Sequence, residues 1–172
     1  MPLTVSHGRG RVRSIAVSLP PFQALLDAHG RDVHRFLVAT VGRVDADDCF
    51  QETWLAALRA YPRLRDTSNL RAWVMKVAHS KAMDHLRARQ RAPVAVAEVF
   101  EGAAVDARRD LDTPDGVWER VAELPSKQRA AVALRFLVDA GYPEIAAAME
   151  TSEDAARRNV HEGLKRLRKE LA

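Results

Sequence analysis

The sequence predicts an all-α protein made of two small helical domains joined by a flexible acidic linker. Apolar residues recur at helical spacing on both sides of a central stretch, and strand-like alternation does not stand out. The central stretch, residues 92–116, has weak helical periodicity and contains six acidic residues against two arginines. Such a composition buries too little apolar surface to form a packed core. The remainder of the 172 residues is enough for two small domains.

We expect four segments along the chain. Composition and periodicity predict a mobile basic arm, a first domain, the acidic linker and a second domain, with boundaries at 1–20, 21–91, 92–116 and 117–172. The arm contains three arginines, but its apolar part is too short for a signal peptide and stops at Pro20. No apolar run approaches the length of a membrane span, so we expect a cytoplasmic protein without membrane insertion.

Three helices are expected in the first domain. The first begins near Phe22 and is closed by Gly42. The second begins after Asp45 and is ended by Pro62. Its apolar face is expected to contain Phe50, Trp54, Ala57, Leu58 and Tyr61. The third begins near Asn69, a residue type that favours the N-cap. It ends in arginines, which interact favourably with the negative end of the helix dipole.

The second domain is expected to begin with a short helix and to continue with a longer one. Ser126 is the predicted N-cap of that longer helix, which runs to about Val138. Gly141 is expected to adopt the left-handed conformation that commonly ends a helix. Further along, Thr151 and Asp154 have the spacing of a capping box at the start of the last helix.

Residues 141–171 have the pattern of a helix-turn-helix. A short helix with Pro143 in its first turn is followed by a tight connection and a long basic amphipathic helix. The basic face of that long helix contains Arg157, Arg158, His161, Lys165, Arg166, Arg168 and Lys169. A helix fits the DNA major groove, where arginine can bind guanine through two hydrogen bonds. A solvated basic face on an ordinary terminal helix is the alternative interpretation.

The third expected helix is basic as well. Residues 69–91 contain six Lys or Arg residues against a single acid, with two interleaved histidines. Nucleic-acid contact and charge balancing at a helix end both account for this pattern. Trp73 could stack on an exposed base, although its spacing favours a place in the core.

Acidic residues cluster at the start of the second expected helix. Asp45, Asp47, Asp48 and Glu52 either compensate the helix dipole or form a surface that docks a partner protein. The spacing is poor for a metal site, and neither a metal nor a cofactor is expected. The single cysteine, Cys49, is expected to be a buried inert thiol. Catalytic motifs do not stand out, so we expect a protein that is not an enzyme.

Taken in order, these motifs resemble the sigma-70 family of transcription initiation factors. Residues 45–54 (DADDCFQETW) resemble region 2.2, and residues 69–87 resemble regions 2.3 and 2.4. Region 4 is resembled by residues 123–129 (ELPSKQR), 142–146 (YPEIA) and 160–168 (VHEGLKRLR). A region 1.1 and a full region 3 are not recognised, as in the small extracytoplasmic-function (ECF) group. Glu150 stands where the family often has glycine.

The resemblance implies a function and a set of sites. The chain would bind the clamp helices and the flap of core RNA polymerase, direct it to −35/−10 promoters and help to melt the DNA. The clamp-docking residues would be Asp47, Asp48, Gln51 and Glu52. The −10 element would be contacted by Trp73, Lys76, His79, Ser80, Arg87 and Arg91. The −35 element would be read by Ser152, Arg157, Arg158, His161 and Lys165.

The resemblance also allows for an anti-sigma partner, which is common in the ECF group. Two other functions stay open at this point. A stand-alone helix-turn-helix regulator would act as a symmetric dimer on a palindrome. A helical scaffold would bind protein and have no affinity for DNA.

Overall fold

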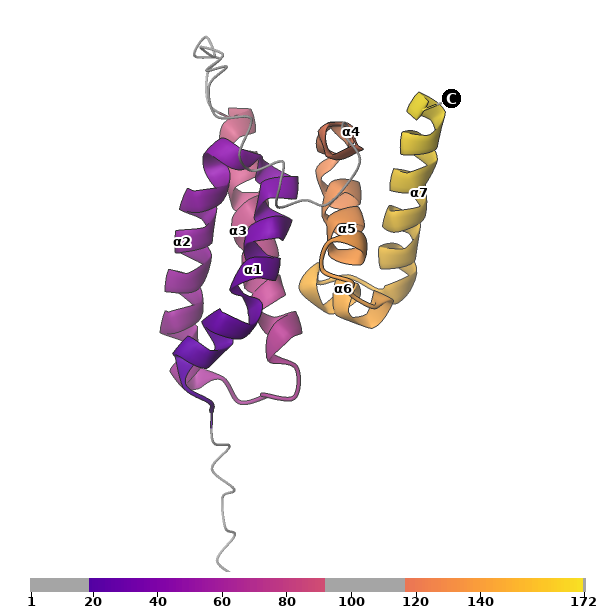
Figure 1. Ribbon diagram of the computed structural model, residues 1–172. Helices are drawn as coiled ribbons and strands as arrows, with labels where there is room; N and C mark the ends of the chain where they lie inside the picture. The colour runs from indigo at the N-terminus through magenta and orange to yellow at the C-terminus, as the bar shows by residue number, and fades with distance from the viewer. Residues whose placement is uncertain (1–18, 92–116, 172) are drawn as a thin grey trace, which may run out of the picture.

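The computed structural model describes residues 19–91 and 117–171, and the regular structure within these ranges is entirely helical (Figure 1). The elements are α1 (Phe22–Val41), α2 (Arg43–Ala60), the 3₁₀ turn η1 (Tyr61–Arg63), α3 (Leu70–Arg91), α4 (Val117–Glu123), α5 (Ser126–Phe136), α6 (Tyr142–Ala148) and α7 (Glu153–Leu171). The all-α prediction is confirmed for these residues. The predicted arm and linker lie outside them. Within the described ranges, no helix combines the length and apolarity needed to span a bilayer.

Helices α1, α2 and α3 pack against one another and form the N-terminal unit (Figure 1). Their core includes Val33, Phe36 and Leu37 of α1, which are completely buried. An aromatic cluster closes one end, where the ring of Phe22 lies 5.8 Å from that of Trp54 and 5.3 Å from that of Tyr61. Edge-to-face contacts at such distances are favourable because the positive ring edge meets a negative face.

The predictions for two helix starts in the N-terminal unit had different outcomes. Gly42 follows α1 with a φ of +88°, a conformation that glycine adopts without steric cost. The chain reverses at this single residue, so α2 begins at Arg43 and the prediction of a start after Asp45 was wrong. Asp45 lies instead in the first turn of α2. The prediction for Asn69 is confirmed, since its side-chain oxygen accepts the Ala72 N–H at 2.9 Å.

Helices α4 to α7 form the C-terminal unit, in which α6 and α7 have the predicted helix-turn-helix arrangement. Here three local predictions were wrong. Pro125 is the N-cap of α5, and Ser126 is already its first helical residue. Helix α5 ends at Phe136, and the left-handed residue after it is Asp139, with φ of 53°. Gly141 has a φ of −70° and precedes α6, where its N–H donates to Glu144 Oε2 at 3.0 Å.

The start of α7 is capped by a different residue from the one predicted. Ser152 Oγ accepts the Ala155 N–H at 3.2 Å, so Ser152 rather than Thr151 is the capping side chain. The expected pairing of Thr151 with Asp154 was therefore wrong. The connection between α6 and α7 also contains Glu150 with a φ of 51°.

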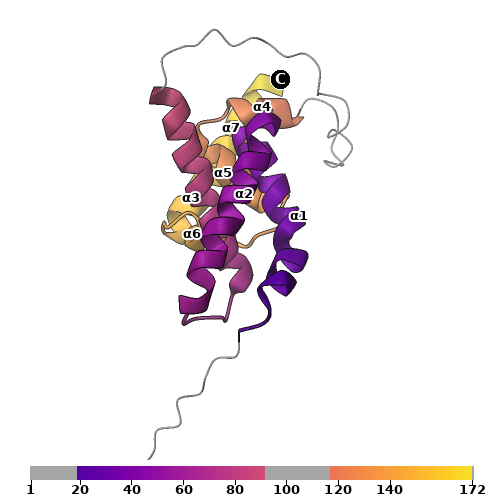
Figure 2. The same cartoon turned by 90° about the vertical axis from the view of Figure 1, so that its left-hand side faces the viewer.

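The two units pack closely on each other. Helices α4 and α5 contact α1, while α6 contacts α3. Buried residues of both units, such as Phe36 and Leu37 on one side and Leu134 and Ile145 on the other, belong to one continuous core. Helix α2 lies on the far side of α1 and α3, facing away from the C-terminal unit (Figures 1 and 2). The molecule is thus a three-helix bundle with the helix-turn-helix unit held against its side.

Within the C-terminal unit, Gly163 lets α7 approach α5 closely. A Cβ atom at this position would lie 2.8 Å from Val132 Cγ2 and 3.5 Å from Leu124 Cδ1. Both neighbours are buried, and the β-branched side chain of Val132 has few alternative rotamers. Any larger residue at 163 must therefore push the two helices apart.

We predict that Gly163→Val lowers the free energy of unfolding by about 1–3 kcal/mol, the usual cost of overpacking a close helix contact. Ala147→Val is the matched control, because Ala147 is exposed on α6. Its loss is expected to stay within about 0.7 kcal/mol, the range of helix propensities. Urea unfolding measures both variants, and equal losses would contradict the close approach.

Candidate functional site

The first candidate surface is the acidic face of α2. Asp47, Asp48, Gln51 and Glu52 are all exposed. Asp45 behaves differently, because it is half-buried and binds two groups of α3: its Oδ2 accepts from Arg89 Nη1 at 2.9 Å and lies 3.1 Å from His85 Nε2. The acidic cluster of the sequence thus divides into one carboxylate that ties α2 to α3 and a set that faces solvent.

Two leucines extend this acidic face. The side chains of Leu55 and Leu58 are 52% and 49% exposed, although large apolar residues usually avoid solvent. The prediction that Leu58 lies on the buried face of α2 was wrong. Leu55 follows Gln51 by four positions and Glu52 by three, so these residues share one helical face. We name Asp47, Asp48, Gln51, Glu52, Leu55 and Leu58 the α2 face. Sequence reasoning missed its apolar half.

The second candidate surface is on α3. Lys76, Ser80, Arg87 and Arg91 are exposed along one side of the helix. Arg87 lies 3.1 Å from Asp84 in an exposed ion pair, which contributes little to stability. Trp73 is half-buried, with its ring 6.1 Å from that of Tyr61, and it packs against the core.

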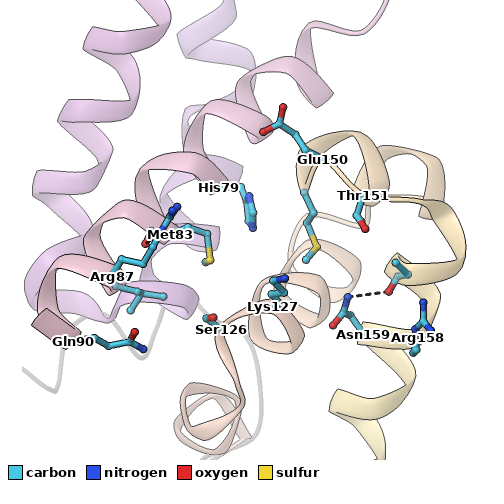
Figure 3. A pocket seen from close by; sticks show the side chains of 13 residues that line it. His79, Met83, Arg87, Gln90, Ser126, Lys127, Glu150, Thr151, Arg158 and Asn159 are labelled. Atoms are coloured by element: carbon cyan, nitrogen blue, oxygen red, sulfur yellow. Dashed lines mark hydrogen bonds between the residues drawn. The ribbon is translucent and has the colours of Figure 1, made fainter.

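A cavity of about 640 Å³ lies between α3 and part of the C-terminal unit (Figure 3). Its wall on α3 includes His79, Met83, Leu86, Arg87 and Gln90. Opposite them lie residues of α5, of the connection between α6 and α7, and of α7 itself: Ser126, Lys127, Met149, Glu150, Thr151, Ala155, Arg158 and Asn159. Predicted −10 residues and a predicted −35 residue therefore line the same space.

His79 is the most strongly perturbed group at this cavity. Burial lowers its pKa to about 4, against a smaller opposing effect of the nearby Glu150 carboxylate. Its Nε2 atom is buried and has no hydrogen-bond partner among the described residues. The imidazole is therefore neutral at physiological pH and offers DNA no positive charge in this conformation.

One ion pair joins α3 to Glu150, a residue that lines the cavity. Lys76 Nζ of α3 lies 2.8 Å from Glu150 Oε1 in the connection before α7. The hydrogen bond and the charge of Lys76 lower the pKa of Glu150. The backbone of Glu150 is left-handed, a conformation that glycine adopts more easily than any other residue.

The third candidate surface is the outward face of α7. Arg157, Arg158, His161 and Lys165 are exposed. Ser152 is exposed as well, although its hydroxyl is engaged as the N-cap of the helix. Arg157, Arg158, His161 and Lys165 therefore share one side of α7, and Ser152 lies just before its first residue. On that side, Arg158 also lines the cavity.

Tyr142 positions Arg157 and was missed by sequence reasoning. The Arg157 guanidinium lies over the Tyr142 ring, 5.0 Å from its centroid, and 3.7 Å from Glu153. Arg135 lies 5.5 Å from the same ring. A cation over an aromatic face is favourable, so Tyr142 restricts the orientation of the Arg157 guanidinium. The only available signal was the aromatic residue at the start of α6.

Cys49 is not part of a reactive site. The residue is 2% exposed, and burial raises the pKa of its thiol to about 11, with nearby carboxylates adding to the effect. The thiolate is therefore scarce at neutral pH, as expected for an inert structural cysteine.

Comparison with known proteins matches both units of the chain to one family. The family model for Sigma-70 region 2 matches residues 25–92, and the model for Sigma-70 region 4 matches residues 115–167. The ECF RNA polymerase sigma factor SigX of Bacillus subtilis is 29% identical over 161 residues, which are 87% of this chain and 83% of SigX. The ECF RNA polymerase sigma factor SigD of Mycobacterium tuberculosis is 34% identical over 151 residues, 81% of this chain and 71% of SigD.

The fold has relatives among solved structures too. The sigma factor RpoE of Bartonella quintana, solved in complex with the anti-sigma factor NepR, superposes with a TM-score of 0.68 at 21% identity, covering 87% of this chain and 96% of that chain. The two family regions occur in the order that the sigma-70 resemblance predicts, and one ECF relative is 34% identical. The chain belongs to the sigma-70 family and is an extracytoplasmic-function (ECF) sigma factor.

Proposed function

We propose that this sigma factor divides its work among the three surfaces described above. The α2 face docks on core RNA polymerase, α3 engages the −10 element, and α7 reads the −35 element. The observation that supports the proposal most strongly is the outward basic face of α7 on a helix-turn-helix. An independent dimeric regulator is not favoured, because residues 25–92 of the chain also match the region 2 model.

Reading of the −35 element would depend on Arg157, Arg158 and His161. They occupy the first three turns of α7, in the N-terminal half of the helix, the part of a recognition helix that contacts base edges. Ser152 and Lys165 lie at the start of α7 and further along it, where contacts to phosphate oxygens are expected. Phosphate contacts set the position of the helix on the duplex, and base contacts supply the sequence preference.

Engagement of the −10 element would use the exposed cations of α3 together with Trp73 and His79. Lys76, Arg87 and Arg91 would attract the DNA backbone, and Ser80 would offer a hydroxyl. Opening DNA there requires a base to leave the stack, at a cost of a few kcal/mol. Aromatic stacking and a cationic surface offset such a cost on single-stranded DNA.

Docking on polymerase would combine charge and apolar contact. The carboxylates of Asp47, Asp48 and Glu52 would meet basic residues of the clamp helices, and Leu55 and Leu58 would lose their exposure to water there. Charges at the rim of an interface raise the association rate, whereas buried apolar groups at its centre supply much of the affinity.

We further propose that the protein acts in the cytoplasm, without cofactor or catalytic activity of its own. We also propose, by analogy with RpoE, which was solved in complex with the anti-sigma factor NepR, that an anti-sigma protein regulates this chain. The decisive experiment is run-off transcription with purified core polymerase. Initiation from a −35/−10 promoter only when this chain is present supports the proposal. Tight binding to a palindrome without core polymerase would instead indicate a dimeric regulator.

For −35 reading, we predict that Arg157→Ala weakens binding to the matched −35 duplex by about 1–3 kcal/mol, with a much smaller loss on a scrambled duplex. Arg168→Ala is the comparator, because Arg168 lies near the end of the same helix and is exposed. Its loss should be similar on both duplexes, as for a phosphate contact. Fluorescence anisotropy with holoenzyme measures both variants, and a uniform loss for Arg157→Ala would contradict base reading.

For polymerase docking, we predict that Asp48→Lys weakens binding to core polymerase tenfold or more, about 1.4 kcal/mol, because like charges would then face each other. Asp27→Lys is the matched control, since Asp27 is an exposed acid on α1 outside the α2 face. Circular dichroism confirms that each variant is folded. Core affinity that is equal for both variants would remove the docking assignment.

A further inference from the structure

We propose that Tyr142 is a positioning residue for −35 recognition: it holds the Arg157 guanidinium in the orientation that reads the promoter, without touching a base itself. The inference rests on the proposed −35 reading by α7 and deepens it, because it names the residue that positions a reading side chain. Its basis is a set of three side chains, Arg135, Tyr142 and Arg157, which we name the Tyr142 stack.

The Tyr142 stack joins three helices at one aromatic ring. Arg135 lies in the last turn of α5, Tyr142 is the first residue of α6, and Arg157 is in the second turn of α7. The two guanidinium carbons lie 5.5 Å and 5.0 Å from the ring centroid, within the range of a cation–π contact. Because α5, α6 and α7 also pack on one another, the ring is tied to the frame of the helix-turn-helix.

The backbone around this ring is held as well. Tyr142 is half-buried and packs against the core. The N–H of Gly141 donates to Glu144 Oε2 at 3.0 Å. Arg135 Nη1 donates to the carbonyl oxygen of Ala140, also at 3.0 Å. These hydrogen bonds fix the chain that leads into α6, so the ring is a fixed surface.

Arg157 would have more freedom without the ring. Its side chain is 60% exposed, and an exposed arginine samples many rotamers that binding must restrict. In the described chain its Nη2 also lies 3.7 Å from Glu153 Oε2. This distance is too long for a hydrogen bond, and exposed ion pairs on a helix contribute little. Tyr142 is therefore the stronger restraint on the guanidinium.

An aromatic ring suits this role better than a carboxylate. A ring face attracts the positive charge of a guanidinium but accepts only weak hydrogen bonds from it. The N–H donors of Arg157 therefore stay available for the O6 and N7 acceptors of a guanine in the major groove. Because these donors have a fixed planar geometry, a wrong orientation of the guanidinium loses both hydrogen bonds at once.

Arg158 provides a contrast on the same helix. It is exposed next to Arg157, but no ring or carboxylate of the described residues contacts its guanidinium. Of these two predicted reading residues, Arg157 alone is positioned by the fold of the unit. The Tyr142 stack should therefore influence the position that Arg157 reads and leave the rest of the −35 preference unchanged.

Binding of the holoenzyme to a matched and to a scrambled −35 duplex tests the role of the ring. Tyr142→Leu removes the aromatic face and keeps an apolar side chain, so the matched duplex should bind about two- to fivefold more weakly and the scrambled duplex equally well. Tyr142→Phe keeps the ring and should retain the affinity for the matched duplex within about twofold. The same preference in Tyr142→Leu as in the unchanged chain would overturn the inference.

Phe136→Leu is the matched control. Phe136 is 55% exposed at the end of α5, and in the described chain no cation lies over its ring. Its substitution should leave the ratio of matched to scrambled binding unchanged. A loss of preference equal to that of Tyr142→Leu would mean that any lost ring disturbs the unit, and the positioning role would be refuted.

A fluorinated ring separates attraction for the cation from packing. Pentafluorophenylalanine at position 142 has nearly the shape of phenylalanine, but its fluorines withdraw electrons from the ring face and remove the attraction for a cation. Its binding to the matched duplex should fall below that of Tyr142→Phe by about two- to fivefold. This comparison remains valid if Tyr142→Leu fails to fold. Equal binding by the two rings would contradict the role of the cation–π contact and overturn the inference.

A double-mutant cycle tests whether Tyr142 acts through Arg157. In the Arg157→Ala background, Tyr142→Leu should cause no further loss on the matched duplex, because its partner is gone. On duplexes changed at one base pair each, both single variants should relax the preference at the same base pair. Losses that add, or relaxation at different base pairs, would show that Tyr142 acts elsewhere and would overturn the inference.

The same measurements separate failure of this inference from failure of the proposed function. If Arg157→Ala weakens binding to the matched and scrambled duplexes equally, base reading by Arg157 is wrong, and the role of Tyr142 is lost with it. If Arg157→Ala loses the preference while Tyr142→Leu keeps it, base reading stands and only the positioning role is lost.

Discussion

The packing of α1 is the contact on which the rest of the structure depends. One side of this helix faces α2 and α3, and another faces α4 and α5. Its residues Val33, Phe36 and Leu37 are completely buried, because apolar surface is covered from both directions. Burial of a large apolar side chain contributes about 1.5–3 kcal/mol, so a helix covered on two sides stabilises two neighbours at once. The N-terminal bundle and the position of the helix-turn-helix therefore share one source of stability.

This arrangement also decides which charged groups serve structure and which remain available to partners. Asp45 is held by Arg89 and lies beside His85, while Asp48 and Glu52 on the same helix point to solvent. Likewise, the side chains of Arg71 and Arg129 donate hydrogen bonds to carbonyl oxygens across the contact between the units, whereas Arg158 remains exposed. A basic or acidic residue count does not separate these two classes. Their burial and their partners do, because a charge that is already hydrogen-bonded gains less from a new partner.

Local signals in the sequence predicted most of the helices, and their failures have a common cause. Asn69 and Gly42 were predicted correctly because each has a strong preference for one backbone position. Where two residues within two positions of each other could fill a role, the sequence did not distinguish them: Ser152 caps α7 instead of Thr151, and Asp139 adopts the left-handed conformation instead of Gly141. The contact between the units was not predictable, since helical periodicity reports that a face is apolar and not what covers it. Leu58 shows the converse, as an apolar residue at helical spacing of which the described chain leaves about half exposed.

Glu150 combines a left-handed backbone conformation with an ion pair between the two units. A non-glycine residue in the left-handed region costs roughly 1–2 kcal/mol, and a carboxylate in a connection beside a DNA-reading helix repels phosphate. Both effects oppose DNA binding and helix-turn-helix stability, so neither explains the residue. Its ion pair with Lys76 does, because that contact exists only while the two units are together. An exposed ion pair is too weak to hold the two units together without the apolar contact. The packing of the two units is therefore mainly apolar, and the ion pair of Lys76 with Glu150 adds to it.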